Sequence, residues 1–211
     1  MPWPEKPIGS VVVFGESTTA GMCATTQDRR WANRFVELVG RFQSEPPRLI
    51  NSAVSASVVS RRSSCYEASA KPSAEERLDQ AVVAHKPDLV VIQYGLNDMR
   101  ANTPLGLYAE VMQSLIHRIR AGTDAAILLG NVAHMTGYDG YAPFCAGSDK
   151  LNHIYNAAIV HLGVANGLPV ADIHTAFNHC DTLIHPDGVH PNDLGHEVIA
   201  QAFFTAWASS H

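Results

Sequence analysis

The chain has 211 residues and a formal net charge of -5 at pH 7, so it carries no excess of basic residues and nucleic acid is not expected as a partner. Hydrophobic residues make up 46% and charged residues 17%, which is the composition of a soluble globular protein. The length predicts one domain, residues 1–211, with a sizeable buried core.

The amino-terminal residues contain no positively charged segment that runs into an apolar one, and no apolar run reaches membrane-spanning length. We therefore expect a cytoplasmic protein without an integral membrane segment, although a chain trimmed of its signal would look the same. Cys23, Cys65, Cys145 and Cys180 are widely spaced and form no Cys-x-x-Cys pair. This spacing favours free thiols over a disulfide framework or a structural zinc site.

The first part of the chain predicts an extended arm, a strand, a helix and a second strand. Prolines at positions 2, 4 and 7 predict the arm, and a β-branched run predicts the first strand at residues 10–14. Residues 48–53 form the second predicted strand, directly after two prolines that end the helix. The apolar residues of that helix recur at helical spacing and are Trp31, Phe35, Leu38, Val39 and Phe42.

The middle of the chain continues the alternation. Ser73 and Glu76 match a capping box, which predicts the start of a helix. Residues 88–93 form a continuous apolar run, typical of a strand that is covered on both faces. A helix between Pro104 and Gly122 and a fourth strand at residues 125–131 follow.

The last part of the chain predicts two more helices around a fifth strand at residues 169–173. The first helix ends near Gly167. Its apolar residues are Leu151, Ile154, Tyr155, Ala158, Ile159 and Leu162. The second helix begins at Pro191, a residue favoured at the first helical position. Its inner face consists of Leu194, Val198, Ile199, Ala202 and Phe203. Strands that alternate with helices predict an α/β fold with a parallel sheet covered on both faces.

Residues 132–148 are rich in glycine and proline and also contain His134, Tyr138, Tyr141 and Phe144. Two interpretations of this stretch stay open. It is either a plain surface loop or a wall over a substrate at the carboxyl edge of the sheet.

Ser17 follows the first predicted strand, in the stretch Phe14-Gly15-Glu16-Ser17. Its hydroxyl is therefore expected at the carboxyl end of a buried strand, where open α/β sheets bind their ligands. A serine becomes a useful nucleophile when a base lies within hydrogen-bond reach and a third group orients that base. The alternative role for Ser17 is to cap the following helix.

A base and its orienting group occur near the other end of the chain, in Asp187-Gly188-Val189-His190-Pro191. Imidazole suits proton transfer near neutral pH, and an aspartate three residues earlier can hold the required tautomer. The chain has 11 histidines, but only His190 has an aspartate at this offset and a proline next to it. The sequence therefore predicts Ser17, His190 and Asp187 as a catalytic triad.

Taken in order, these stretches resemble the SGNH or GDSL-type hydrolase family. The family's Gly-Asp-Ser block reads Gly15-Glu16-Ser17, its Gly-x-Asn-Asp block reads Gly95-Leu96-Asn97-Asp98, and its Asp-x-x-His-Pro block reads Asp187 to Pro191. The second block, Asn-x-x-x-x-Gly, reads Asn51 to Ala56, with alanine in place of glycine. The resemblance spans nearly the whole chain. It implies a three-layer α/β/α fold with a five-stranded, flavodoxin-like parallel sheet in the order 2-1-3-4-5.

The resemblance also implies a function. We expect a serine hydrolase that cleaves carboxylic esters or thioesters, an esterase, lipase or acylhydrolase, without a metal or another cofactor. The implied oxyanion hole consists of the backbone N–H groups of Ser17 and Ala56 and the side chain of Asn97. The expected partner is a small-molecule ester or thioester, whereas the acyl group, the alcohol and the oligomeric state do not follow from the sequence.

Three residues of the motifs have expected supporting roles. Glu16 stands where the family carries aspartate, and we expect it to brace the turn as a hydrogen-bond acceptor. Asn51 and Asp98 are expected to hold turns together through bonds between side chain and backbone. Outside the motifs, Arg61, Arg62 and Arg100 could attract an acidic substrate, but we interpret them as solvated surface charge.

Two alternative functions remain at this stage. In the first, a metal-activated water cleaves the ester. The candidate ligands in the last fifth of the chain are Asp172, His174, His179, His185, Asp187, His190 and His196. No His-x-x-x-His motif lies on a predicted helix, which weakens this alternative. The second is a non-catalytic binding domain on the same fold, in which Glu16 and Ala56 mark a lost activity.

Overall fold

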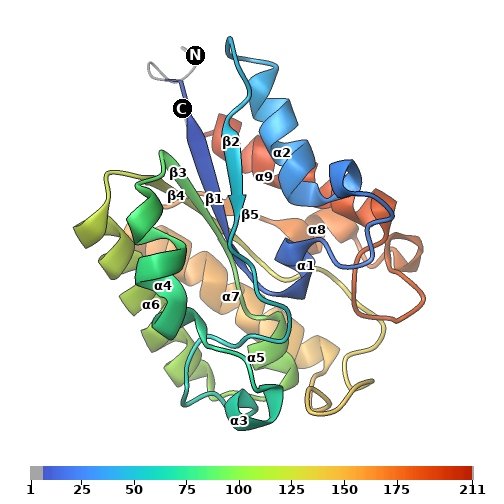
Figure 1. Cartoon of the computed structure of the whole chain (residues 1–211). Helices are drawn as coiled ribbons and strands as arrows, with labels where there is room; N and C mark the ends of the chain where they lie inside the picture. Colours follow the sequence, from blue (N-terminus) through green and yellow to red (C-terminus); the bar gives the residue numbers. More distant parts are fainter. Residues whose placement is uncertain (1–6, 211) are drawn as a thin grey trace.

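The computed structural model describes residues 7–210, and a five-stranded parallel sheet lies at its centre (Figure 1). The strands lie in the order β2-β1-β3-β4-β5, and all neighbouring pairs are parallel. Their bounds are Ser10–Gly15 (β1), Arg48–Asn51 (β2), Leu89–Gln93 (β3), Ala126–Gly130 (β4) and Val170–Ala171 (β5). The predicted fold class and strand order are confirmed. The predicted arm lies outside the described residues, except for Pro7.

Helices cover both faces of the sheet (Figure 1). The α-helices are α1 (Ser17–Ala20), α2 (Trp31–Gly40), α3 (Tyr66–Ser69), α4 (Ala74–Ala81), α5 (Leu96–Arg100), α6 (Leu105–Gly122), α7 (Asp149–Asn166), α8 (Ile173–Phe177) and α9 (Asp193–Ala208). Short 3-10 helices are η1 (Gln27–Arg29), η2 (Val83–His85) and η3 (Asp181–Leu183). Residues of α4, α6 and α7 share one hydrophobic core, and residues of α2, α8 and α9 share the other.

Successive residues of a strand point to opposite faces, and this explains why the central strands are apolar throughout. Val12 and Phe14 of β1 belong to the core on the α4, α6 and α7 side, whereas Val11 and Val13 belong to the core on the α2 and α9 side. All four side chains are fully buried. The sheet is therefore a rigid platform for the residues at its carboxyl edge.

Three helix starts were predicted from their residues, and the predictions at Ser73 and Pro104 are confirmed, since α6 begins at Leu105. Ser73 caps α4 in a capping box, with Glu76 Oε2 accepting the Ser73 N–H at 2.9 Å. The predicted start at Pro191 is wrong, because α9 begins at Asp193. Asn192 caps this helix instead, since its side-chain oxygen accepts the N–H groups of the residues two and three positions later. Pro191 forms a bridge with Ile184.

Three residues assigned to buried helix faces are exposed. Phe42 is 53% exposed because α2 already ends at Gly40, and its ring stacks on Phe204 outside the core. Ile154 on α7 and Leu194 in the first turn of α9 are 38% and 61% exposed. Their spacing is helical, but they lie at the margin of the apolar stripe.

Four short helices were not predicted from the sequence: α1, α3, α5 and α8. Each has four or five residues, which is too short to show an apolar period. Two of them position the site, because α1 directly follows β1 and α5 directly follows β3. These strands are neighbours, with Gly15 paired to Gln93, so the two helices begin side by side at the carboxyl edge.

Within residues 7–210, none of the helices combines the length and the apolar character that a bilayer span requires. No disulfide joins the four cysteines, which confirms the prediction of free thiols. Cys145 and Cys180 are exposed, and Cys23 and Cys65 are half-buried.

Candidate active site

Ser17 lies at the turn between β1 and α1. A Cβ on Gly15 would lie 2.2 Å from Thr19 Oγ1 and 2.4 Å from the carbonyl oxygen of Gln93, so only glycine fits there. The chain then enters α1 at once, and Gly21, with φ of 88°, ends this helix after one turn. The turn holds the Ser17 hydroxyl at the carboxyl edge of the sheet.

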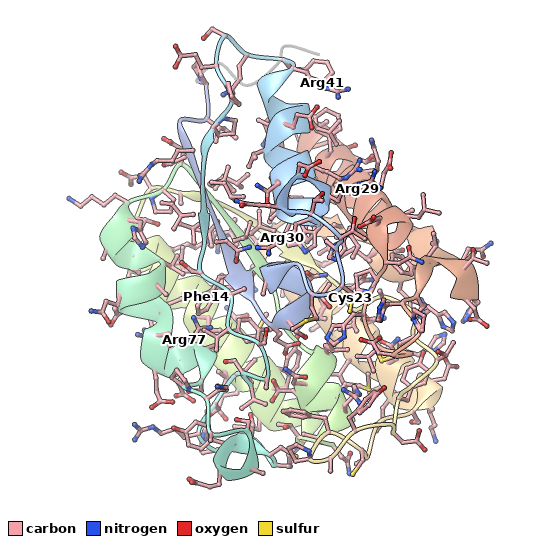
Figure 2. All side chains as sticks on the ribbon, turned by 45° about the vertical axis from the view of Figure 1, so that its right-hand side comes forward. Phe14, Cys23, Arg29, Arg30, Arg41 and Arg77 are labelled. Atoms are coloured by element: carbon pink, nitrogen blue, oxygen red, sulfur yellow. The ribbon has the colours of Figure 1, made fainter. Side chains whose placement is uncertain are left out.

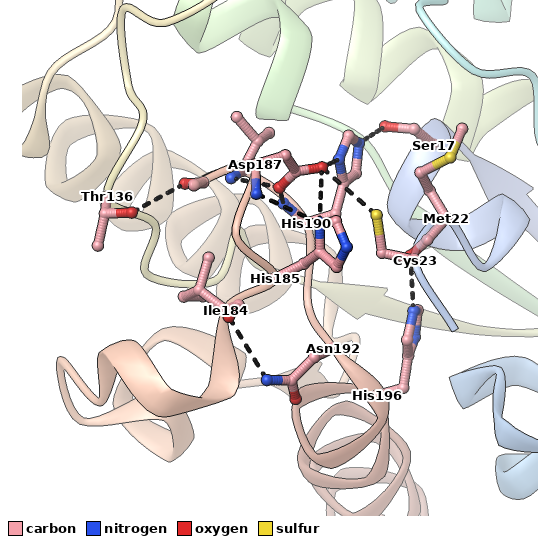
Figure 3. Close-up of polar contacts among 12 residues, drawn as sticks. Ser17, Met22, Cys23, Thr136, Ile184, His185, Asp187, His190, Asn192 and His196 are labelled. Carbon is pink, nitrogen blue, oxygen red and sulfur yellow. Dashed lines mark hydrogen bonds and ion pairs between the residues drawn. The ribbon is translucent and has the colours of Figure 1, made fainter. Parts of the chain in front are cut away.

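The structure brings together the three side chains predicted as a triad, although Ser17 and His190 are 173 positions apart (Figure 3). His190 Nε2 lies 2.9 Å from Ser17 Oγ, and His190 Nδ1 lies 2.7 Å from Asp187 Oδ2. These partners assign the tautomer in which Nδ1–H donates to the carboxylate and Nε2 accepts from the serine hydroxyl. The imidazole is therefore aimed at Ser17 with its lone pair.

Hydrogen bonds fix the Asp187 carboxylate and keep it ionised. Asp187 Oδ1 accepts the backbone N–H groups of Val189 and His190, at 2.9 and 3.0 Å. Partial burial acts to raise the pKa of Asp187, but the bonds from the backbone and the imidazole of His190 outweigh it and hold the pKa below its usual value. A negative charge thus stays beside the imidazole.

Loop 132–148 supports the segment that carries Asp187. Gly188 has φ of 75°, and its carbonyl oxygen accepts the N–H groups of Thr136 and Gly137 at 2.9 and 2.7 Å. A Cβ on Gly188 would lie 3.0 Å from Gly137 N, so the two segments meet backbone to backbone. The loop lies at the surface over residues 139–142 but contacts the site's framework through Thr136 and Gly137.

Two residues beside Asp187 were missed in the sequence. Cys23 Sγ donates to Asp187 Oδ2 at 3.4 Å, and His185 Nδ1 accepts the Asp187 N–H at 3.2 Å (Figure 3). Burial and the contact with Asp187 raise the pKa of the Cys23 thiol to about 12, so it stays protonated. Cys23 lies on the turn after α1 and no motif marks it, whereas His185 lies two residues before Asp187 and was noted only as a metal ligand.

Asn97 and Ala56 carry the other predicted oxyanion donors. Asn97 is buried, and its Nδ2 donates one hydrogen to the Ser57 carbonyl oxygen at 2.9 Å. The amide has a second N–H that can donate to a substrate oxygen. Ala56 has φ of 64°, in the left-handed region where the family's glycine costs least. The alanine therefore adopts the conformation of a glycine position at some cost in strain.

Glu16 braces the start of α5, as expected, and the extra methylene does not prevent it. The carboxylate is buried and accepts the N–H groups of Gly95 and Asn97, at 3.2 Å each for the shortest contacts. Burial, followed by the negative charge of Asp98, raises the pKa of Glu16 well above its usual value. The Glu16 side chain therefore positions the backbone of Asn97. Its surroundings favour the neutral carboxylic acid.

Asp98 and Asn51 hold turns together, which confirms the prediction for both. Asp98 Oδ2 accepts the Val59 N–H at 2.9 Å and Oδ1 accepts the Ser63 hydroxyl at 2.7 Å. Complete burial raises the pKa of Asp98 to about 6. Asn51 donates to the Thr19 carbonyl oxygen at 2.9 Å.

Arg77, which the sequence did not single out, supports the segment before Ala56. Its guanidinium lies 4.8 Å over the centroid of the Phe14 ring (Figure 2) and donates to the Ser52 carbonyl oxygen at 2.8 Å. It also donates to the hydroxyl of Tyr94. Arg77 thus joins α4, β1 and the chain that follows β2.

The interpretation of three arginines as solvated charge is correct for two of them. Arg61 and Arg62 are exposed and pair with Glu76 and Glu110. Arg100 is buried, as are the other residues of α5. Its Nε donates to the Tyr138 carbonyl oxygen at 3.1 Å, and burial lowers its pKa.

The residues proposed as metal ligands do not form one group. Asp187 and His190 lie beside Ser17, while His196 is buried against the Met22 carbonyl oxygen and Asp172 caps α8. Three sets of potential ligands lie close enough for an ion among the described residues. They are Cys23 with His185 and Asp187, His134 with Asp149 and His179, and Asp149 with His153 and His174.

A small apolar cavity of about 20 Å³ lies beside the site. It is lined by the neighbours of Ser17 in the sequence, Glu16 and Thr18, and by the neighbours of His190, Val189 and Pro191. Its other lining residues are Gln93, Tyr94, Leu96, Val132, Ala133 and Met135. Loop 132–148 therefore forms one wall of the cavity.

Comparisons with solved structures identify the same fold. An acetylxylan esterase from Geobacillus stearothermophilus is 21% identical, with a TM-score of 0.70 and coverage of 95% of this chain and 96% of that one. A lipase/acylhydrolase from Enterococcus faecalis is 20% identical, with a TM-score of 0.75 and 95% of each chain covered. An alpha/beta hydrolase enzyme from the metagenome of Lake Arreo is 19% identical, with a TM-score of 0.69 and 94% of each chain covered.

No curated protein matches the chain. The GDSL-like lipase/acylhydrolase family matches residues 13–198, a range that includes Ser17, Asn97, Asp187 and His190. This match covers most of the sequence, so the chain is an ester hydrolase that belongs to the GDSL-like lipase/acylhydrolase family.

Proposed function

We propose that the protein cleaves carboxylic esters or thioesters by covalent catalysis, with Ser17 as nucleophile, His190 as general base and Asp187 as the group that orients the base. One observation carries the proposal, the hydrogen-bonded chain in which His190 contacts Ser17 Oγ at 2.9 Å and Asp187 at 2.7 Å. Nucleophile and base lie within hydrogen-bond reach, and a third group holds the base.

The reaction proceeds in two halves. Ser17 Oγ attacks the carbonyl carbon while His190 Nε2 takes the hydroxyl proton, and the imidazolium then gives this proton to the leaving alcohol or thiol. The products of the first half are the free alcohol or thiol and an acyl ester on Ser17. Water attacks that ester with His190 again as base, and the proton returns to Ser17 Oγ as the acid leaves. The ionised Asp187 stabilises the imidazolium in both halves.

The oxyanion of each tetrahedral intermediate is bound by three N–H donors. Ser17 N–H is in the first turn of α1, where backbone N–H groups have no acceptor within the helix. The other donors are the backbone of Ala56 and the second N–H of Asn97, which Glu16 positions through the backbone. Burial shifts Glu16 and Asp98 towards their neutral forms, so less negative charge opposes the oxyanion.

The apolar cavity lined by the sequence neighbours of Ser17 and His190 is small. A volume of about 20 Å³ accommodates little more than one group of the size of water or methyl. The structurally similar acetylxylan esterase is named for an acetyl ester, which agrees with this size. We therefore infer that acetyl esters are better substrates than esters of long fatty acids.

Ester turnover by the wild type and by Ser17→Ala tests the proposal against both alternatives. We expect the wild type to hydrolyse an acetyl ester faster than the octanoyl ester of the same alcohol, with and without a chelator, and Ser17→Ala to be inactive. A metal-dependent hydrolase would lose turnover to the chelator and keep it in Ser17→Ala. A binding domain would turn over neither ester.

A further inference from the structure

A second group of histidines lies apart from the hydrogen-bonded chain of Ser17, His190 and Asp187. His134 comes from loop 132–148, His153 from α7, His174 from α8 and His179 from the turn after α8. Ring centroids are 5.1 Å apart for His134 and His179, 4.7 Å for His153 and His174, and 5.5 Å for His174 and His179. Four imidazoles from separate segments therefore meet in one place.

Asp149, the first residue of α7, lies among these rings. Together with His134 and His179 it offers three donor atoms that all lie within 4.8 Å of one another. The same is true of Asp149 with His153 and His174. The carboxylate is thus shared by two sets of ligands, which together include all four histidines.

His134 has the hydrogen bonding of a metal ligand. Its Nε2 lies 2.8 Å from Asp181 Oδ1, and its Nδ1 is buried without a hydrogen-bond partner. When Nε2–H donates to the carboxylate, Nδ1 carries a bare lone pair. A carboxylate that holds the far nitrogen of a histidine is the usual support of a ligand to zinc. A buried nitrogen without a partner is otherwise costly.

His174 and His153 offer further donor atoms. His174 Nε2 is also buried without a hydrogen-bond partner. His153 Nδ1 lies 2.9 Å from the backbone oxygen of Asp149, which leaves Nε2 to bind an ion. Asp149 Oδ1 accepts the hydroxyl of Tyr138 at 3.1 Å, so the carboxylate is itself oriented.

We propose that Asp149, His134, His153, His174 and His179 form a binding site for a divalent transition-metal ion of the zinc type. Imidazole and carboxylate are the ligands that suit such an ion, whereas calcium and magnesium prefer oxygen alone. The ion ties loop 132–148 to α7 and α8. Because the same loop holds Gly188 and lines the cavity, the site stabilises the framework of the catalytic edge without entering the reaction.

Calorimetric titration of the chelator-treated, desalted protein with zinc chloride near neutral pH tests the proposal. We expect saturable binding with a stoichiometry of about one ion per chain. His134→Ala combined with His174→Ala removes one ligand from each set and should weaken binding by about tenfold or more. His161→Ala removes an exposed histidine from the same helix, α7, and should bind zinc as the wild type does.

Zinc should also raise the melting temperature of the wild type and of His161→Ala, but not that of the double variant. Asp149→Asn, which keeps the shape of the side chain, provides a second variant if the double variant does not fold, and it should bind zinc more weakly than the wild type. Absence of saturable binding to the wild type would overturn the proposal. Equal affinity in the wild type and in a folded ligand variant would do the same.

Discussion

Two regions of the site, the segment that carries Asp187 and the start of α5, surround their carboxylates differently. Asp187 is partly exposed and receives hydrogen bonds from the backbone and the imidazole of His190, so its pKa lies below the usual value. Glu16 and Asp98 are buried on the side of Asn97, and burial raises their pKa values. Both regions contain acidic residues, yet hydrogen bonds favour the ionised form of Asp187, whereas burial shifts Glu16 and Asp98 towards their neutral forms.

This difference matches the charges that ester cleavage develops. In the proposed mechanism, a positive charge forms on the imidazole beside the ionised Asp187, and a negative charge forms on the substrate oxygen near Asn97. An ionised carboxylate beside that oxygen would oppose the reaction. Burial and hydrogen bonding, more than residue type, therefore decide what an acidic side chain contributes.

The largest expected effect on the Asn97 side follows from removing the side-chain donor. Asn97→Ala should lower kcat by about a hundredfold or more, or roughly 3 kcal/mol in transition-state stabilisation, with a smaller change in KM. The nucleophile and the base remain, so slow turnover should persist. Steady-state kinetics with an acetyl ester measure both constants.

Asn166→Ala is the matched control, since this asparagine bonds to Gln113 at the far end of α7. It should leave kcat unchanged. Wild-type kcat in a folded Asn97→Ala would mean that the side chain only holds its turn through Ser57.

The next effect concerns stability and pH. Because the pKa of Asp98 is about 6 in the folded protein and 3.8 ordinarily, the folded state binds this proton more readily than the unfolded chain does. The free energy of unfolding should therefore fall as pH rises from about 4 to about 6, by roughly 3 kcal/mol. Asp98→Asn should reduce this slope, as measured by urea unfolding across the same range.

Asp124→Asn, at an exposed position, should keep the wild-type slope. If Asp98→Asn and the wild type lost stability equally as pH rises, Asp98 would not be the cause of the slope. Glu16 reinforces the effect in the wild type, because the charge of Asp98 contributes to raising its pKa.

The smallest effect is expected from Ala56→Gly. Glycine adopts a φ of 64° without the steric cost that alanine bears, so the variant should gain about 1 kcal/mol of stability. The backbone N–H remains, and kcat should change little. Ala70→Gly, at φ of 50° in the C-cap of α3, should show a similar gain in urea unfolding. A loss of stability confined to Ala56→Gly would show that the methyl group matters more than the strain.

Much of the fold was predictable because the signals were local and regular. The strands around Val12 and Val90 are continuous apolar runs, and the period of α6 and α7 extends over 18 residues each. The strand order came from the family resemblance, whereas the triad of Ser17, Asp187 and His190 was predicted from residue types and spacing and is matched by the family's motifs. The helix start at Pro191 failed because a capping asparagine next to it provides the stronger signal.

The remainder depends on contacts between distant segments. Nothing in the sequence places Cys23 on Asp187, or buries Arg100 beneath residues 138–147, because both contacts exist only after the loops pack. The histidine group illustrates the same limit. His174 and His179 were counted with His190 because they are near it in sequence, whereas the fold pairs them with His134 and His153.

Covalent labelling tests whether Ser17 is the nucleophile. A fluorophosphonate should form one adduct with the protein, and mass spectrometry should place it on the peptide that carries Ser17, because His190 Nε2 contacts this hydroxyl. His190→Ala should label far more slowly, and Ser17→Ala should not label. An adduct on another residue, or ester turnover without any adduct, would contradict the assignment of Ser17 as the nucleophile.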